Sequence, residues 1–276
     1  MDTDPLADSV PPRHAIESDE EEDEYNPLRP QPNLPTEIDV KLVGTVANVP
    51  APGLLIASGS LGKYWGRGVQ LGEQIAAVMV NKIQVGLLFQ PSWTKSVILV
   101  SEVTTRLPLW AMHPYARTIL DAIQPKNIAL LDTYAVPSYI SATRIAFIDA
   151  PLRYLTTDAP PSAFTSLAQP FAAPNLIQST SAAFVALRAE RMATAVLVLV
   201  PAEQVTPLAP RDLAPSDFSH WNDAAPWTAT PVRTAHALLA AALGEQVTTW
   251  TEPAPEKPTA AQTRKRPTET EVGMYI

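Results

Sequence analysis

Glycine-rich segments can hold phosphate groups, because a backbone without side chains approaches the ligand closely. The chain has a single cluster of glycines, which comprises Gly59, Gly62, Gly66, Gly68 and Gly72. Its Gly62-Lys63 pair is similar to the end of a P-loop, but Ala57 and Tyr64 occupy positions where that motif requires glycine and serine or threonine. A dinucleotide-binding pattern fails in the same way at Leu71. We therefore expect a turn-rich loop here and no bound nucleotide.

The sequence also lacks the motifs of hydrolytic enzymes. The chain has no Gly-x-Ser-x-Gly elbow, and a serine triad needs a histidine that an acid orients. The four histidines are scattered along the chain, at His14, His113, His220 and His236. We expect His113 to cap the start of a helix and His236 to lie in the core. No catalytic residue is assigned, and the protein is not expected to be an enzyme.

Asp132 ends a predicted buried strand, and doubly wound sheets bind ligands at the carboxyl ends of their strands. The favoured role for Asp132 is a hydrogen bond to the backbone of the next turn. The alternative is an α/β enzyme of phosphorylase or hydrolase type with an unrecognised active site. Cysteine is absent, which excludes disulfides, thiol nucleophiles and Cys-based zinc sites. We predict no metal site and no cofactor.

The last three residues carry the most informative chemistry. Met274, Tyr275 and Ile276 combine a hydrophobe, an aromatic ring with one hydroxyl, and a final residue with its carboxylate. The ring can bury a large apolar area, and the carboxylate can make a charge-assisted contact with a basic pocket residue. This pattern is typical of chain ends that another protein captures. These three residues are therefore the predicted partner-binding site.

Charge is distributed unevenly along the chain. Residues 1–39 contain twelve acids and two bases, a net −10, whereas residues 40–276 contain sixteen acids and eighteen bases, a net +2. The near-neutral body argues against binding nucleic acid through charge. The acidic leader is not a secretory signal, and no run approaches the roughly 20 apolar residues that span a membrane. We expect a soluble protein of the cytoplasm or nucleus.

Hydrophobic patterns predict an alternation of strands and helices. Strands are expected over residues 41–46, 54–58, 75–80, 84–89, 97–103, 128–132, 144–148 and 196–200. Helices are expected over 114–124, with Pro114 in the first turn, over 180–192, and from an N-cap at Thr230 to Gly244. The segments 75–80 and 84–89 read as a hairpin, and 97–132 reads as a βαβ unit. The predicted fold class is α/β, a three-layer sandwich with a largely parallel or mixed central sheet.

Composition divides the chain into three parts. Residues 1–38 are predicted to be a disordered acidic leader, because seven of the eight residues from Glu17 to Glu24 are acids. Ser18 lies within this run and is a candidate acceptor for an acid-directed kinase, although a purely solubilising leader explains the same composition. Residues 39–250 form the predicted domain, with Pro-rich surface insertions at about 157–175 and 201–228. Residues 251–276 are predicted to be a flexible tether, in which Arg264-Lys265-Arg266 is a solvated or nuclear-import sequence.

The ending Met274-Tyr275-Ile276 resembles the hydrophobic–tyrosine–any-residue (HbYX) tail of proteins that dock on the α-ring of the 20S proteasome. A domain of this size with such a tail is similar to the proteasome assembly chaperones, in particular the fungal chaperone-1 type. The resemblance implies a non-catalytic protein that forms a heterodimer with a second assembly chaperone and contacts 20S α-subunits. It also implies that the chaperone promotes ring assembly, blocks premature binding of regulators, and presents its terminal carboxylate to a lysine between α-subunits. A plain adaptor whose ending matches by accident is the third possibility.

Overall fold

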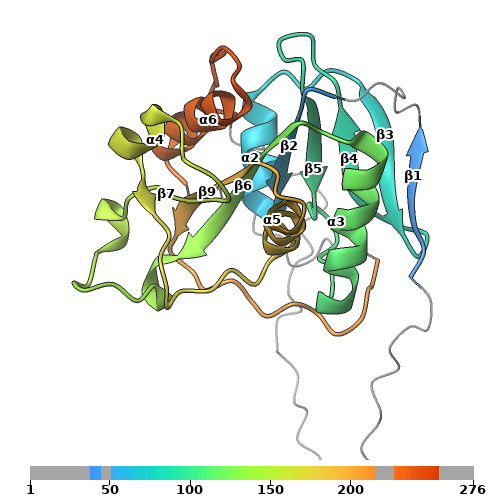
Figure 1. Ribbon diagram of the computed structural model, residues 1–276. Coiled ribbons are helices and arrows are strands. Elements are labelled where there is room, and N and C mark those ends of the chain that lie inside the picture. The colour runs from blue at the N-terminus through green and yellow to red at the C-terminus, as the bar shows by residue number, and fades with distance from the viewer. Residues whose placement is uncertain (1–37, 45–50, 216–226, 255–276) are drawn as a thin grey trace, which may run out of the picture. The chain divides into compact units, whose positions relative to one another are not determined.

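A mixed β-sheet forms the centre of the computed structural model, which describes residues 38–44, 51–215 and 227–254 (Figure 1). The strands in the described ranges are β1 (Val40–Gly44), β2 (Gly53–Ser58), β3 (Gln74–Val80), β4 (Ile83–Phe89), β5 (Val97–Ser101), β6 (Asn127–Ala135), β7 (Arg153–Thr156), β8 (Gln169–Pro170) and β9 (Ala195–Ala202). The helices described are α2 (Gly59–Gly68), α3 (Leu109–Ile123), α4 (Ser162–Leu167), α5 (Thr180–Glu190) and α6 (Ala229–Leu243), with 3₁₀ turns η2 (Val136–Ser138) and η3 (Phe147–Asp149).

Four adjacent parallel strands occupy the middle of the sheet. The strand order is β1-β3-β4-β5-β2-β6-β9-β7-β8, in which β5, β2, β6 and β9 run parallel and β1, β3 and β4 continue antiparallel from β5. Because β5 and β6 both flank β2, the connection through α3 crosses over β2. All residues of β2 and β5 are buried, as expected for parallel strands covered on both faces. The predicted α/β class and the βαβ unit are confirmed.

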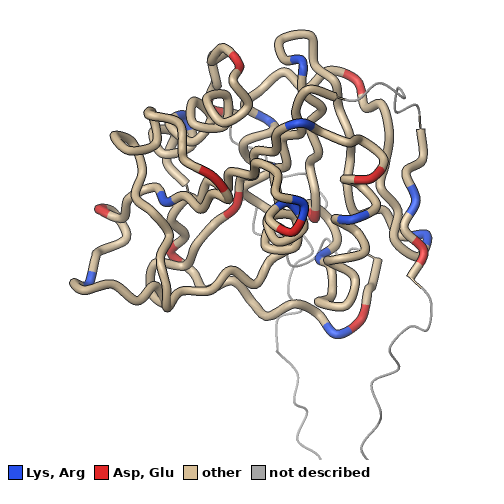
Figure 2. The backbone as a smooth tube through the Cα atoms, in the orientation of Figure 1, with Lys and Arg blue, Asp and Glu red and all other residues tan. Residues whose placement is uncertain are grey.

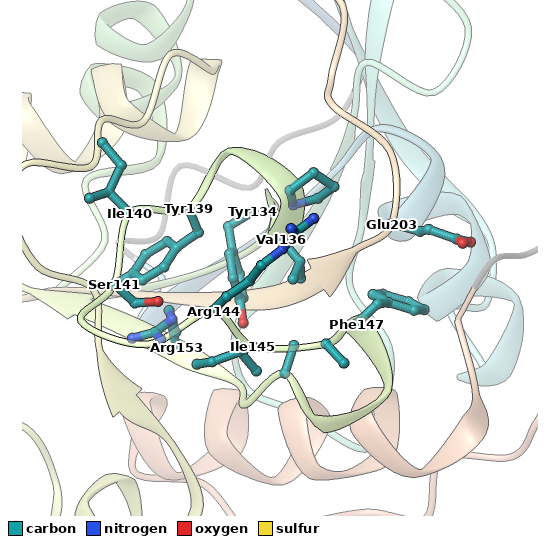
Figure 3. Close-up of a pocket in the computed structure, with 13 residues that line it drawn as sticks. Tyr134, Val136, Tyr139, Ile140, Ser141, Arg144, Ile145, Phe147, Arg153 and Glu203 are labelled. Carbon is teal, nitrogen blue, oxygen red and sulfur yellow. The ribbon is translucent and has the colours of Figure 1, made fainter.

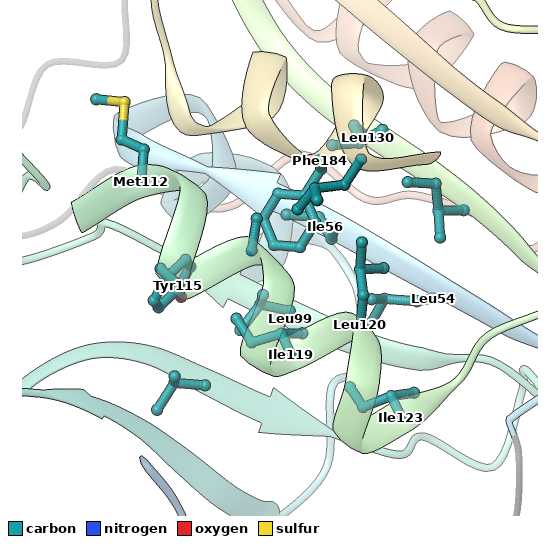
Figure 4. Packing of buried hydrophobic residues seen from close by; sticks show 14 of the residues in the cluster. Leu54, Ile56, Leu99, Met112, Tyr115, Ile119, Leu120, Ile123, Leu130 and Phe184 are labelled. Atoms are coloured by element: carbon teal, nitrogen blue, oxygen red, sulfur yellow. The ribbon is translucent and has the colours of Figure 1, made fainter. Parts of the chain in front are cut away.

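Helices α3 and α5 cover one face of the sheet, and α2 and α6 cover the other, with α4 packed beside α6. Side chains alternate along β2, so that Leu54 and Ile56 face α3 and α5 while Leu55 and Ala57 face α2 and α6. Figure 4 shows residues from the sheet meeting those from the first helix pair; they are Leu54, Ile56, Leu99, Leu130, Ile119, Leu120 and Phe184. The two apolar clusters complete a three-layer sandwich, as predicted.

The hairpin of β3 and β4 turns on two residues with left-handed backbones. Asn81 and Lys82 have φ of 47° and 70°, which is the conformation of the primed turns that match the twist of paired strands. The Asn81 carboxamide oxygen also accepts a hydrogen bond from the Asp39 N–H at 3.0 Å. The predicted hairpin is confirmed, with a tighter turn because Ile83 already pairs with Val80.

The glycine cluster is a helix, so the predicted loop between strands is wrong. Residues 59–68 form α2, which packs on the sheet. A Cβ at Gly62 would lie 2.5 Å from the backbone carbonyl of Ala57, and one at Gly68 would overlap the Trp250 indole nitrogen. The glycines therefore allow close packing, and the buried surface outweighs their poor helix propensity. No phosphate loop exists in this region.

Two helix starts differ from the prediction. Helix α3 begins at Leu109 with Pro108 as N-cap, so Pro114 lies in the second turn and exposed His113 caps nothing. Its predicted end is right, because Gln124 closes the helix with φ of 49° and donates to the Leu120 carbonyl at 2.9 Å. Helix α6 begins at Ala229, which makes Thr228 the N-cap in place of Thr230. Gly244 closes α6 with φ of 70°, as predicted.

The predicted strand over residues 144–148 is wrong. This segment is irregular and leads into η3, while the strand β7 follows at Arg153–Thr156 and pairs antiparallel with β9. The alternating apolar residues Ile145 and Phe147 line a surface pocket and do not join the sheet. The predicted insertion 157–175 contains α4 and β8 and buries Phe164 completely, so it belongs partly to the fold. Insertion 201–228 begins with the last two residues of β9 and is irregular over its other described residues, 203–215 and 227–228.

Positions of charged residues are interspersed along the described backbone (Figure 2). Lysines and arginines lie between aspartates and glutamates, and the described residues show no long segment of one sign. None of the helices within the described ranges has the length and apolar character needed to cross a membrane.

Candidate functional site

The predicted partner-binding residues Met274, Tyr275 and Ile276 lie outside the described residues, as do Ser18 and residues 264–266. What the structure provides is the place from which the C-terminal segment departs. Trp250 is 1% exposed and lies against α2, where its Nε1–H donates to the Trp65 carbonyl at 3.0 Å. Its ring centroid is 5.7 Å from that of Tyr64. The chain is therefore fixed to α2 at Trp250.

Two hydrogen bonds to backbone carbonyls extend this attachment by four residues. The Thr251 N–H donates to the Gly68 carbonyl at 3.0 Å, and the Arg67 guanidinium donates to the Ala254 carbonyl at 3.1 Å. Ala254 is consequently held at the C-terminal end of α2. Subtracting 254 from 276 leaves 22 residues between this point and the end of the sequence. The segment that ends in Ile276 therefore leaves the domain at a defined place, next to the end of α2.

Asp132 lies inside β6 near its carboxyl end, where it organises two segments. Its Oδ1 accepts a hydrogen bond from the Thr133 N–H at 2.7 Å, so it binds backbone as predicted, but Thr133 lies within β6 and not in a turn. Its Oδ2 accepts a second from the Ser179 hydroxyl at 2.6 Å, and Ser179 is the N-cap of α5. Burial raises the pKa of Asp132, and these hydrogen bonds act in the opposite direction.

Glu102 is a second carboxylate at this edge of the sheet, and no sequence pattern singled it out. It follows β5 in a left-handed conformation with φ of 53° and is 8% exposed. Its Oε1 accepts from the Leu107 N–H at 2.8 Å, which holds the loop before α3. Burial raises the pKa of Glu102, and the charge of Asp132 raises it further. The hydrogen bonds give each carboxylate a structural role, since Glu102 holds the loop before α3 and Asp132 holds the N-terminus of α5.

The described histidines do not join this pair of carboxylates. His236 is 2% exposed in α6, where Nδ1 accepts from the Trp65 Nε1–H at 3.3 Å and Nε2 lies 3.1 Å from the Thr248 carbonyl oxygen. It is a core histidine with both nitrogens engaged, as predicted. Burial lowers its pKa. His113 is exposed on α3, and His14 and His220 lie outside the described residues. Among the described residues, no three histidine or carboxylate side chains gather to hold a metal ion.

A pocket of about 530 Å³ opens between the end of β6, residues 136–150 and β7 (Figure 3). Its lining includes Tyr134, Tyr139, Arg144, Phe147 and Arg153. Sequence reasoning missed this pocket, because its walls come from a segment predicted as a strand and from a strand that was not predicted. The pocket can accept a small group with apolar sides, and its basic residues favour a negative charge.

No protein-family model matches the chain, and no curated protein matches it. Among solved structures, PbaB of Pyrococcus furiosus, described as an archaeal proteasome activator, is similar over 76% of this chain and 91% of its own, with 9% identity and a TM-score of 0.48. PbaA of the same organism, described as an archaeal homolog of proteasome-assembly chaperone, is similar over 76% and 88%, with 11% identity and a TM-score of 0.48.

A proteasome-assembly chaperone homologue of Mycobacterium tuberculosis is similar over 54% of this chain and 75% of its own. Its identity is 7% and its TM-score is 0.33.

Proposed function

We propose that this protein is a proteasome assembly chaperone, of the fungal chaperone-1 type, which works by protein–protein contact and catalyses no reaction. It pairs with a second assembly chaperone and docks on the α-ring of 20S proteasome precursors through Met274, Tyr275 and Ile276. On the ring it promotes assembly and keeps regulators away until the particle matures. It acts in the cytoplasm or nucleus.

One observation carries the proposal, namely the hydrophobic–tyrosine–any-residue ending of the sequence. The proposal takes Ile276 as the residue that bears the free carboxylate. Burial of about 200 Å² of tyrosine at roughly 25 cal/mol/Å² contributes at most about 5 kcal/mol before entropy losses. An isolated tail peptide would consequently bind with a Kd on the order of tens of µM to mM. Other contacts of the protein must therefore supply the remaining binding affinity.

The attachment at Ala254 supports such cooperation. A flexible segment of 22 residues has a root-mean-square reach of roughly 25 Å. A domain already resting on the ring would hold the tail at an effective concentration of about 1 mM near its pocket. Under this proposal the domain and its partner provide most of the affinity, and the tail adds register and selectivity.

The test compares full-length proteins that differ only near the C-terminus. Affinity-tagged wild type, Tyr275→Ala, Tyr275→Phe and the matched control Thr270→Ala are expressed in cells, and the chains that co-purify are identified by mass spectrometry. We expect wild type and Thr270→Ala to retain 20S α-subunits and a second chaperone. Recovery of α-subunits should fall at least tenfold with Tyr275→Ala. The fall should be smaller with Tyr275→Phe, because the aromatic side chain remains.

Retention of the second chaperone by all four proteins would show that the domain is intact. Equal recovery of α-subunits with Tyr275→Ala and wild type would refute the role of the tail. Complete absence of proteasome subunits from wild-type preparations would refute the proposed function itself.

A further inference from the structure

The pocket beside β7 contains a buried cation without an anion to neutralise it. Arg153 is 6% exposed, and among the described residues no carboxylate forms an ion pair with its guanidinium. A buried charge is costly unless it is paired, so proteins rarely retain one alone. Glu203 also lines the pocket, but its side chain is exposed and lies apart from Arg153 (Figure 3). The anion that completes this site is therefore expected from outside the described fold.

Aromatic rings fix the guanidinium in place. Its central carbon lies 3.8 Å from the ring centroid of Tyr139 and 5.6 Å from that of Tyr134. The two rings contact each other edge-to-face at 5.3 Å, and Tyr139 packs similarly on Phe171 at 5.5 Å. The Tyr134 hydroxyl donates to the Pro151 carbonyl at 2.6 Å, which anchors the cluster. Arg153 is thus held ready, and a ligand need not reorganise it.

One edge of the guanidinium remains available for hydrogen bonding. Nη1 donates to the Pro170 carbonyl at 3.2 Å. The Nε–H is buried and has no acceptor, and the guanidinium also interacts with the Tyr134 hydroxyl. Nε and Nη2 together form the edge that binds the two oxygens of a planar carboxylate in parallel.

The remaining walls define what the carboxylate is attached to. Val136, Ile140, Ile145 and Phe147 provide apolar surface, and the volume of about 530 Å³ is within the range of small-ligand sites. Exposed Arg144 extends over the same pocket and adds a second positive charge at its rim (Figure 3). The pocket is therefore suited to a compact apolar body that carries one carboxylate.

We propose that this pocket binds a carboxylate attached to an apolar or aromatic group, with Arg153 as its bidentate partner and Arg144 closing the rim. The carboxylate can come from a small organic acid or from the last residue of a peptide. The site is separate from the proposed role of the tail, and either proposal can fail without the other.

Isothermal titration calorimetry of the full-length protein tests the site with matched probes. N-acetyl-phenylalanine presents a carboxylate on an aromatic body, and N-acetyl-phenylalaninamide is its uncharged counterpart. We expect the acid to bind at least tenfold more tightly than the amide. Arg153→Gln should abolish the difference, and Arg144→Gln should weaken binding of the acid about threefold.

A second pair of variants keeps the test valid should Arg153→Gln fail to fold. Ala146 lines the pocket and Ala142 does not, although both are exposed in the same loop. Ala146→Trp is expected to fill the pocket and lower the affinity for the acid at least tenfold, whereas Ala142→Trp should leave it unchanged. A peptide ending in phenylalanine that binds tenfold more tightly than the acid identifies a chain terminus as the source, and equal affinity identifies a small acid.

Three results would overturn the proposal. They are equal affinity for acid and amide, no heat of binding with 20 mM acid, or equal loss of affinity in the two tryptophan variants. Inorganic phosphate that binds more tightly than the acid, and depends equally on Arg153, would refute the carboxylate as the ligand.

Discussion

His236 shows how one buried ring ties a helix to the segment that precedes the C-terminus. Because Trp65 Nε1 can only donate, Nδ1 must accept, and the neutral ring carries its proton on Nε2 toward the Thr248 carbonyl. Protonation of Nδ1 would remove the bond with Trp65 in a site that disfavours charge. The structure thus requires the neutral form of His236.

Lower pH is therefore expected to weaken the fold through His236. Burial lowers its folded-state pKa, so its stabilisation is complete above the unfolded value of about 6.5 and is lost as pH falls below that value. Urea unfolding from pH 8 to 5 should show the stability advantage of wild type over His236→Gln shrinking, by at most about 1.4 kcal/mol per pH unit. His113→Gln, which alters an exposed histidine, is the control. A constant difference across the range would contradict the assigned ring state.

Replacing Asp132 separates the cost of its charge from the value of its hydrogen bonds. Burial raises the folded-state pKa of Asp132, so its ionisation opposes folding at pH 7, and this penalty shrinks as pH falls below the folded-state pKa and vanishes near the unfolded value of 3.8. Asparagine can still accept from the Thr133 N–H and can donate to the Ser179 hydroxyl. By urea unfolding at pH 7, Asp132→Asn should equal or exceed wild type, whereas Asp132→Ala should lose about 1–3 kcal/mol. Equal losses in both variants would disprove this division.

At the scale of elements, the packing of α2 against the C-terminal segment predicts opposite results for two glycines of one helix. Gly68→Ala would force Trp250 away from its seat, at a cost of about 1–3 kcal/mol. A Cβ at Gly66 would meet only the flexible Leu71 side chain at 3.3 Å and Val100 at 3.8 Å. Gly66→Ala should therefore be neutral or gain up to about 1 kcal/mol of helix propensity. Thermal unfolding measures both, and a tolerated Gly68→Ala would contradict the described seat of Trp250.

The elements that sequence patterns predicted are those whose signal is local. The apolar runs of β2, β5, β6 and β9 and the helical periodicity of α3 and α5 are visible without knowledge of their neighbours. Helix α2 was missed because glycines favour turns over helices, and the contact that requires glycine at position 68 is made by Trp250, which is distant in sequence. Strand β7 was missed because it places Arg153 at a buried position, where an apolar residue is expected.

The candidate sites also differ in whether their signal is local in sequence. Asp132 and His236 could be interpreted in advance, since a strand end and a helix stripe are local features. The pocket around Arg153 depends on rings from β6 and the following loop meeting β7, a juxtaposition that tertiary structure creates. The three terminal residues differ from the pocket, because the sequence alone indicates their chemistry. They lie outside the described residues.

For the whole molecule, we propose different tasks for the domain and for the chain end. The domain fixes residue 254 beside α2, and the 22 residues that follow connect this point to Met274, Tyr275 and Ile276. Stability should consequently be insensitive to changes at Tyr275, whereas docking should depend on them. Docking of wild type and of Tyr275 variants can therefore be compared between proteins of the same stability.

The most direct measurement is the Kd of the purified full-length protein, together with its proposed partner chaperone, for purified 20S core particles. Surface plasmon resonance compares the wild-type protein with Tyr275→Ala. We predict that Tyr275→Ala raises the Kd at least tenfold while the unfolding temperature of the protein is unchanged. Equal Kd values for the two proteins would contradict the claim that the terminal tyrosine and carboxylate dock on the α-ring.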